Sequence, residues 1–136
     1  MTRTLVTALV FALAAAASVQ AQIRSELVAS GFSAPVAFVQ DPSDRTVQVV
    51  LEQAGHVRVL KNGVVQALDF LDLSGVVVSS GEMGLLGLAF APDYGTSRRF
   101  FVYFIVHPNG DPTLQATVVA RFLRSLTNPL RADPDS

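Results

Sequence analysis

The residues best suited to chemistry are one carboxylate in a glycine-rich turn and two separate histidines. Glu82 lies in the segment GEMGLLGLAFAPDY, residues 81–94. A carboxylate in such a turn can accept hydrogen bonds from a ligand. A solvated or turn-capping Glu is the alternative interpretation. His56 and His107 are the only imidazoles, and neither has a neighbouring carboxylate in the sequence, so we expect both to be structural or solvent-facing and not metal ligands.

Other motifs offer weaker chemistry. Gly81, Gly84 and Gly87 have the spacing GxxGxxG, but no helix is expected after them, and phosphate loops rely on a helix amino terminus. The oxygen-rich runs 109–111 and 133–135 lack the multiple carboxylates of a calcium loop. We interpret the first as a turn and the second as a disordered tail. These motifs therefore predict no metal ligand and no catalytic residue.

Composition excludes several classes of protein. The chain has 136 residues, ten basic and eleven acidic, and no cysteine. Without cysteine there is neither a disulfide framework nor a thiolate metal site. Neither sign of charge forms a block of five or more, so nucleic acid is not an expected partner, because phosphate binding depends on clustered Lys and Arg.

The first residues have the pattern of a secretory signal peptide. Arg3 precedes an apolar run from Leu5 to Ala17, and Val19 and Ala21 fit a small-residue cleavage site. The run is shorter than the ~20 residues that span a bilayer, although an uncleaved anchor remains the alternative. We expect residues 1–21 to be removed, a secreted or periplasmic location, and no membrane span afterwards.

The rest of the chain predicts an all-β fold. Alternating apolar residues indicate strands at 47–52, 56–60, 100–106 and 115–123, with a third strand or strand-like exit at 64–73. Asn62-Gly63 is typical of a type I′ hairpin turn. In the strand that follows Glu82, Leu86, Leu88 and Phe90 are expected to face a core, with Gly87, Ala89 and Ala91 on a small opposite face.

Two blocks of the sequence resemble each other. Ala37-Phe38 followed by Asp41 recurs as Ala89-Phe90 followed by Asp93, with a proline next to each Asp and an Arg-led strand after it. A repeat of antiparallel strands favours β-propeller blades over a β-sandwich. We therefore expect two four-stranded blades over 22–126 and a connecting loop at 127–136.

Two blades cannot close a ring, because propellers have about four to eight. The chain is therefore expected to be the amino-terminal part of a longer propeller, or to cover its open edges by assembling with other chains. An unpaired strand at 115–123 is an expected site of edge association.

These segments resemble the glucose/sorbosone dehydrogenase family. The resemblance runs through VASGFSAPVAFVQDP (28–42), LEQAGHVRVLKNG (51–63), FLDLS (70–74), GEMGLLGLAFAPDY and RRFFVYF (98–104), in the expected order. It implies a partial six-bladed propeller from a secreted enzyme that uses pyrroloquinoline quinone (PQQ) and calcium to oxidise a sugar or alcohol. Met83 and Ala91 depart from the family pattern, which often has a polar residue and a His at those positions.

The resemblance also implies that most of the chemistry lies outside this chain. The family's catalytic histidine, its quinone-binding arginines and its calcium ligands come from later segments. Glu82 matches a position near the active-site mouth that is often Gln or Glu. The resemblance implies that a carboxylate there hydrogen-bonds a sugar hydroxyl or helps to orient the quinone, so Glu82 is the one cofactor-binding candidate of the chain. The chain alone is therefore expected to bind no cofactor and to be inactive. A non-catalytic ligand-binding propeller of the same family is the alternative.

Overall fold

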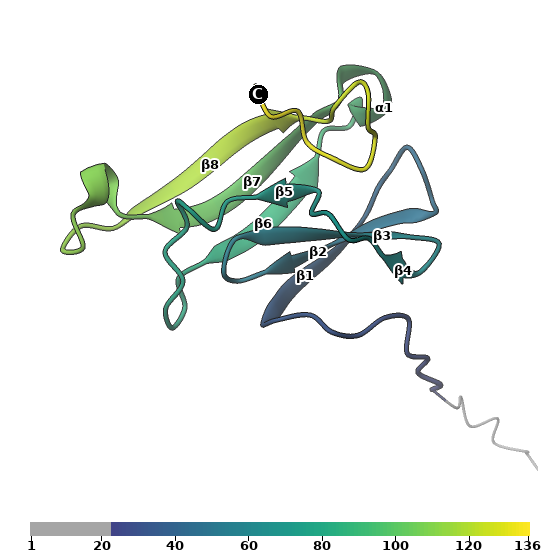
Figure 1. Cartoon of the computed structure of the whole chain (residues 1–136), viewed down its shortest axis with the longest axis horizontal. Helices are drawn as coiled ribbons and strands as arrows, with labels where there is room; N and C mark the ends of the chain where they lie inside the picture. Colours follow the sequence, from purple (N-terminus) through teal and green to yellow (C-terminus); the bar gives the residue numbers. More distant parts are fainter. Residues whose placement is uncertain (1–22) are drawn as a thin grey trace, which may run out of the picture.

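The computed structural model describes residues 23–136, and its regular secondary structure is almost entirely antiparallel strand (Figure 1). The first sheet contains β1 (Pro35–Gln40), β2 (Val47–Glu52), β3 (His56–Lys61), β4 (Val64–Val65) and β5 (Leu71–Asp72). The second sheet contains β6 (Leu85–Phe90), β7 (Arg99–Val106) and β8 (Ala116–Leu123). A single helical turn, α1 (Tyr94–Ser97), links β6 to β7, and a 3-10 turn, η1 (Pro108–Gly110), precedes β8.

The first sheet follows the predicted pattern, with one interruption. Asn62 and Gly63 have φ values of 53° and 75°, as both central residues of a type I′ turn require. The chain then returns along β3 in two short pieces, β4 and β5, which both pair with β3. The expected strand at 64–73 is thus present but broken in its middle.

The second sheet has three strands in the described residues, one fewer than the predicted four-stranded blade. Its first strand also differs from the predicted alternation. A register shift between Leu85 and Gly87 interrupts the pairing of β6 with β7, and such a bulge changes which face the preceding side chains take. Leu85, and not Leu86, is therefore fully buried in the core, while Leu88 and Phe90 pack against it as predicted.

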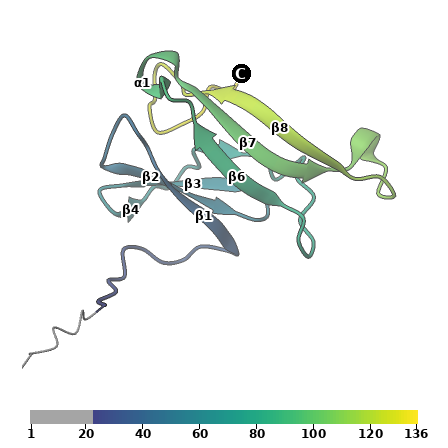
Figure 2. The same ribbon diagram turned by 180° about the vertical axis from the view of Figure 1, so that it is seen from behind.

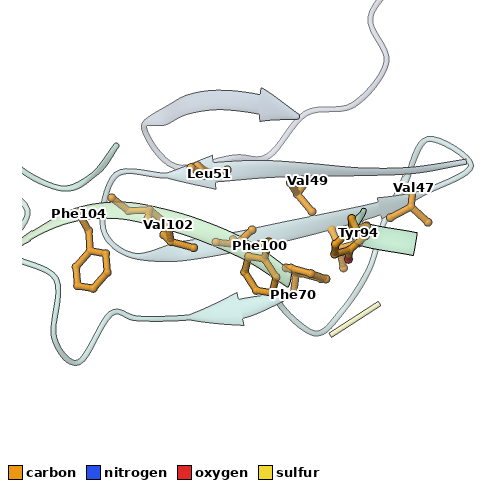
Figure 3. Close-up of a cluster of buried hydrophobic side chains, with 11 residues drawn as sticks. Val47, Val49, Leu51, Phe70, Tyr94, Phe100, Val102 and Phe104 are labelled. Atoms are coloured by element: carbon orange, nitrogen blue, oxygen red, sulfur yellow. The ribbon is translucent and has the colours of Figure 1, made fainter. Parts of the chain in front are cut away.

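The core lies between the two sheets (Figure 3). Phe70, which precedes β5, packs against Phe100 of β7 with ring centroids 5.0 Å apart. Tyr94, at the start of α1, is fully buried and packs against Phe90 at 4.5 Å. Side chains from one face of β2 complete the layer: Val47, Val49 and Leu51. The Pro-Asp-Tyr turn after β6 thus contributes a core residue as well as ending the strand.

The orientation of the repeated blocks shows how the sheets are related. In β1, Ala37 packs against the core and Phe38 is 60% exposed. In β6 the order is reversed, because Phe90 packs against the core and Ala89 is exposed. Opposite faces of the two repeats therefore meet. A head-to-tail contact of this kind continues in one direction, as in a ring, whereas a two-fold pair joins like faces. The two sheets are stacked as the blades of a partial β-propeller.

The segment after β8 is folded back onto the molecule, so residues 133–135 are not the disordered tail that we expected. Ala132 N donates to the carbonyl oxygen of Phe70 at 2.7 Å, and Asp133 N donates to that of Leu123 at 2.7 Å. Figure 2 shows this carboxyl-terminal loop beside α1. The predicted signal peptide, residues 1–21, lies outside the described residues. Between residues 23 and 136, no helix is both long and apolar enough to cross a membrane.

Candidate functional site

Glu82 lies at the tip of a tight turn between the two sheets. The turn closes through Met83 N donating to Ser80 O at 2.9 Å, with a longer return bond of 3.3 Å from Ser80 N to Met83 O. Gly81 has a φ of 57°, a left-handed conformation that glycine adopts without strain. Glu82 itself is exposed. Its carboxylate is therefore presented to solvent from a closed backbone turn.

Gln53, which directly follows β2, holds this turn from the first sheet. Its side-chain Nε2 donates to Gly81 O at 2.6 Å and to Met83 O at 2.9 Å. Its backbone oxygen accepts from Leu85 N at 2.9 Å. Gly84 lies so close that an added Cβ would be 2.5 Å from Gln53 Cγ. The sequence-based interpretation had identified Glu82 but had missed Gln53.

A surface groove of about 530 Å³ lies between the loop before the Glu82 turn and η1. Val78 N donates to Ile105 O, which joins that loop to β7. His107 lines the groove, and its Nδ1 lies 2.6 Å from the carbonyl oxygen of Leu114. The groove has no Lys or Arg in its lining. It does not by itself fit PQQ, because the several carboxylates of that quinone are best bound by cationic side chains, which the groove lacks.

His56 is part of an ion-pair cluster, although no carboxylate adjoins it in the sequence. Its Nδ1 lies 2.8 Å from Asp69 Oδ2 and 3.5 Å from Asp72 Oδ1. Arg58 Nε lies 2.8 Å from the other oxygen of Asp69. Hydrogen bonds from Ser74 lower the pKa of Asp72, and the nearby His56 adds to the effect.

The three groups His56, Asp69 and Asp72 have donor types that can bind a divalent cation. However, the Arg58 guanidinium already neutralises Asp69, and His56 is in hydrogen-bond distance of it. The cluster is a network of charged groups that joins β3 to β5, in which Arg58 Nε is buried and makes an ion pair but no hydrogen bond. His56 thus takes part in a charged network through partners that the sequence analysis did not identify.

Together, the head-to-tail sheets and the turn between them define the chain as a partial β-propeller. Solved structures that match this fold include sugar dehydrogenases, and the chain resembles glucose and aldose sugar dehydrogenases. An oxidoreductase described as a glucose dehydrogenase, from Thermus thermophilus, matches with a TM-score of 0.63 and 25% identity over 77% of this chain. The soluble aldose sugar dehydrogenase of Escherichia coli matches with a TM-score of 0.58 and 27% identity over 71%.

The PQQ-bound aldose sugar dehydrogenase of Streptomyces coelicolor also matches, with a TM-score of 0.58 and 23% identity over 77% of this chain. The match covers 28% of the Thermus protein, 29% of the Streptomyces protein and 26% of the Escherichia protein. The chain thus spans less than a third of each. No family model matches the chain.

Proposed function

We propose that this chain is the amino-terminal part of a secreted, PQQ-dependent sugar dehydrogenase of the glucose/sorbosone dehydrogenase family. The observation that supports this best is the shared fold with sugar dehydrogenases, one of which binds PQQ. The order of the sequence segments supports the same family. In such an enzyme bound PQQ would supply the hydride acceptor, and the protein would supply position and electrostatics.

Within this proposal, the chain contributes Glu82 to the mouth of the active site. An exposed carboxylate on a closed turn can accept a hydrogen bond from a sugar hydroxyl, because the backbone that carries it is already ordered. Neither histidine serves as the general base. His56 is engaged with Asp69, and His107 is engaged with a backbone carbonyl. The base, the quinone-binding arginines and the calcium ligands come from blades outside this sequence.

The test is a dye-reduction assay on the purified chain with PQQ, calcium and an aldose. We expect no turnover above a buffer control. Measurable turnover would show that the chain carries its own base and would contradict the proposal. The coding sequence beyond Ser136 separates this proposal from its alternative. A histidine motif followed by arginines fits the enzyme, while their absence fits a ligand-binding propeller.

The role of Glu82 is tested in the longer dehydrogenase that the proposal implies. Glu82→Gln keeps the size of the side chain and removes its charge, and Glu82→Ala removes the acceptor as well. We expect KM for the sugar to rise more in the alanine variant than in the glutamine variant. Glu26→Gln, another exposed glutamate, is the control. Unchanged kinetics in both Glu82 variants would remove Glu82 from the site.

A further inference from the structure

The turn that carries Glu82 is clamped by one side chain from the neighbouring sheet. Both carbonyls that flank Glu82, those of Gly81 and Met83, accept hydrogen bonds from the Nε2 of Gln53. A primary amide has two N–H donors on that nitrogen, so one side chain can satisfy both acceptors together. We infer that Gln53 is a positioning residue that sets the direction of the Glu82 carboxylate, an inference that rests on the proposed role of Glu82.

Backbone hydrogen bonds hold Gln53 next to the Glu82 turn. The clamp, meaning the two hydrogen bonds from Gln53 Nε2 to Gly81 O and Met83 O, depends on this position. Gln53 N donates to Ala34 O at 3.0 Å, and Gln53 O accepts from Leu85 N at 2.9 Å. Gly84, between the turn and β6, leaves room for Gln53, since a Cβ there would lie 2.7 Å from the Gln53 backbone oxygen. The Gln53 backbone is therefore held by hydrogen bonds to the segment before β1 and to β6. This position places its side-chain amide within reach of the turn.

The chemistry of the contact requires a donor. Gln53→Glu keeps the shape of the side chain but places carboxylate oxygens against two carbonyl oxygens, which repel them. Gln53→Lys restores a donor, because an ammonium group can donate to both carbonyls. Comparing Gln53→Glu with Gln53→Lys separates the effect of losing the hydrogen-bond donor from the effect of changing the size of the side chain. Gln66→Glu is the matched control, since Gln66 also donates to a carbonyl, that of Val64, in an exposed hairpin.

The first experiment measures amide hydrogen exchange in this chain. The Met83 amide is bonded within the turn, and the Leu85 amide is bonded to the backbone of Gln53. In Gln53→Glu we expect Met83 to exchange about tenfold faster, the effect of losing roughly 1.4 kcal/mol of hydrogen bonding, with Leu85 unchanged. Gln53→Lys should restore slow exchange, and Gln66→Glu should leave it unaltered. Unchanged exchange at Met83 in Gln53→Glu would overturn the clamp.

The second experiment is a double-mutant cycle in the longer dehydrogenase, with KM and kcat for the sugar measured separately. Gln53→Glu should raise KM in the native background and have no further effect in Glu82→Ala. A kinetic effect that persists without Glu82 would overturn positioning through Glu82. If Glu82→Ala itself changes nothing, the proposed role of Glu82 fails, and positioning through it fails too, whereas the exchange result still decides whether the clamp exists.

Discussion

Gly55 is a single residue on which the turn between β2 and β3 depends. It has a φ of 112°, and an added Cβ would lie 2.8 Å from Ser74 N and 2.9 Å from the carbonyl carbon of Leu73. These are backbone atoms, which cannot turn aside as a flexible side chain can. Leu73 N also donates to Gly55 O at 2.9 Å. The turn from β2 to β3 therefore touches the chain leaving β5 with no intervening side chain.

Gly55→Ala is expected to destabilise the fold, because it adds both a backbone clash and an unfavourable φ. The loss should be about 2–4 kcal/mol of unfolding free energy, measured by urea denaturation. Gly75→Ala is the control, since no atom lies within 4 Å of its added Cβ and its change should be small. Equal stability of the two variants would contradict the close approach at Gly55.

Asp44, in the turn between β1 and β2, is joined to the end of β3 through Lys61. Lys61 Nζ donates to Asp44 Oδ2 at 2.7 Å, and Thr46 donates to Oδ1. The bond from Lys61, followed by those from Thr46, lowers the pKa of Asp44 well below its usual range. The folded state therefore binds this proton less readily than the unfolded state. The stabilisation is present above the unfolded pKa, about 3.9, and is lost as pH falls through the lower folded pKa.

We accordingly expect Asp44→Asn to reduce the loss of stability in acid. The difference between the native chain and the variant should be largest near neutral pH and shrink below about pH 4. Denaturation midpoints measured across this range check the direction. Glu26→Gln, which removes another carboxylate, is the control. A difference that stays constant down to acid pH would show that the Asp44 pairings do not depend on ionisation.

Among elements, the segment around Phe70 joins both sheets to the carboxyl-terminal loop. The Phe70 side chain is 1% exposed and packs against Phe100 of β7. Its backbone N donates to Val57 O in β3, and its backbone oxygen accepts from Ala132 N. One residue outside any strand thus contacts three parts of the fold. This interruption between β4 and β5 places an aromatic ring in the core.

Phe70→Ala is expected to cost about 3–5 kcal/mol, since it removes a buried aromatic ring between two sheets that cannot fully close the cavity. Thermal or urea unfolding measures the loss. Leu68→Ala, two residues earlier and 58% exposed, should change stability by less than about 1 kcal/mol. A similar effect at both positions would argue against the inter-sheet role of Phe70.

Strand positions could be predicted from the sequence because alternation and turn residues are local signals. The strand at 47–52 and the Asn62-Gly63 turn are found as expected. The bulge at Leu85 could not be predicted, because it depends on pairing with β7. The pairing of His56 with Asp69 could have been predicted from the sequence. Counting pairs outward from the Asn62-Gly63 turn places Asp69 opposite His56 in an unbroken hairpin.

Other parts of the site depend on contacts between sheets. Gln53 contacts Gly81 and Met83 across a long sequence separation, and no periodicity in the sequence predicts such a bond. The break between β4 and β5 also has no local marker, and it brings Asp72, as well as Asp69, beside His56. Strands that depend on the alternation of apolar residues could thus be predicted from the sequence. Features that depend on packing between the two sheets could not.

At the scale of the whole molecule, head-to-tail stacking leaves two apolar faces without a sheet against them. Phe38 is 60% exposed on the outer face of the first sheet. On the outer face of the second sheet, Tyr103 is 39% exposed and Val119 is 67% exposed. Val119 lies on β8, which pairs only with β7 and so has one free edge in the described residues. An apolar face beside a free edge favours association.

Val119→Lys is expected to weaken self-association of the isolated chain, because a charge on an edge strand opposes both apolar contact and strand pairing. Sedimentation velocity over a range of concentrations should show a shift toward monomer. Leu126→Lys is the control, since Leu126 is 78% exposed but lies beyond β8, and it should leave association unchanged. If both lysine variants dissociate the chain equally, net charge and not the sheet face governs association. If neither does, contacts elsewhere hold the copies together, and the outer face of the second sheet is not where copies of this chain meet.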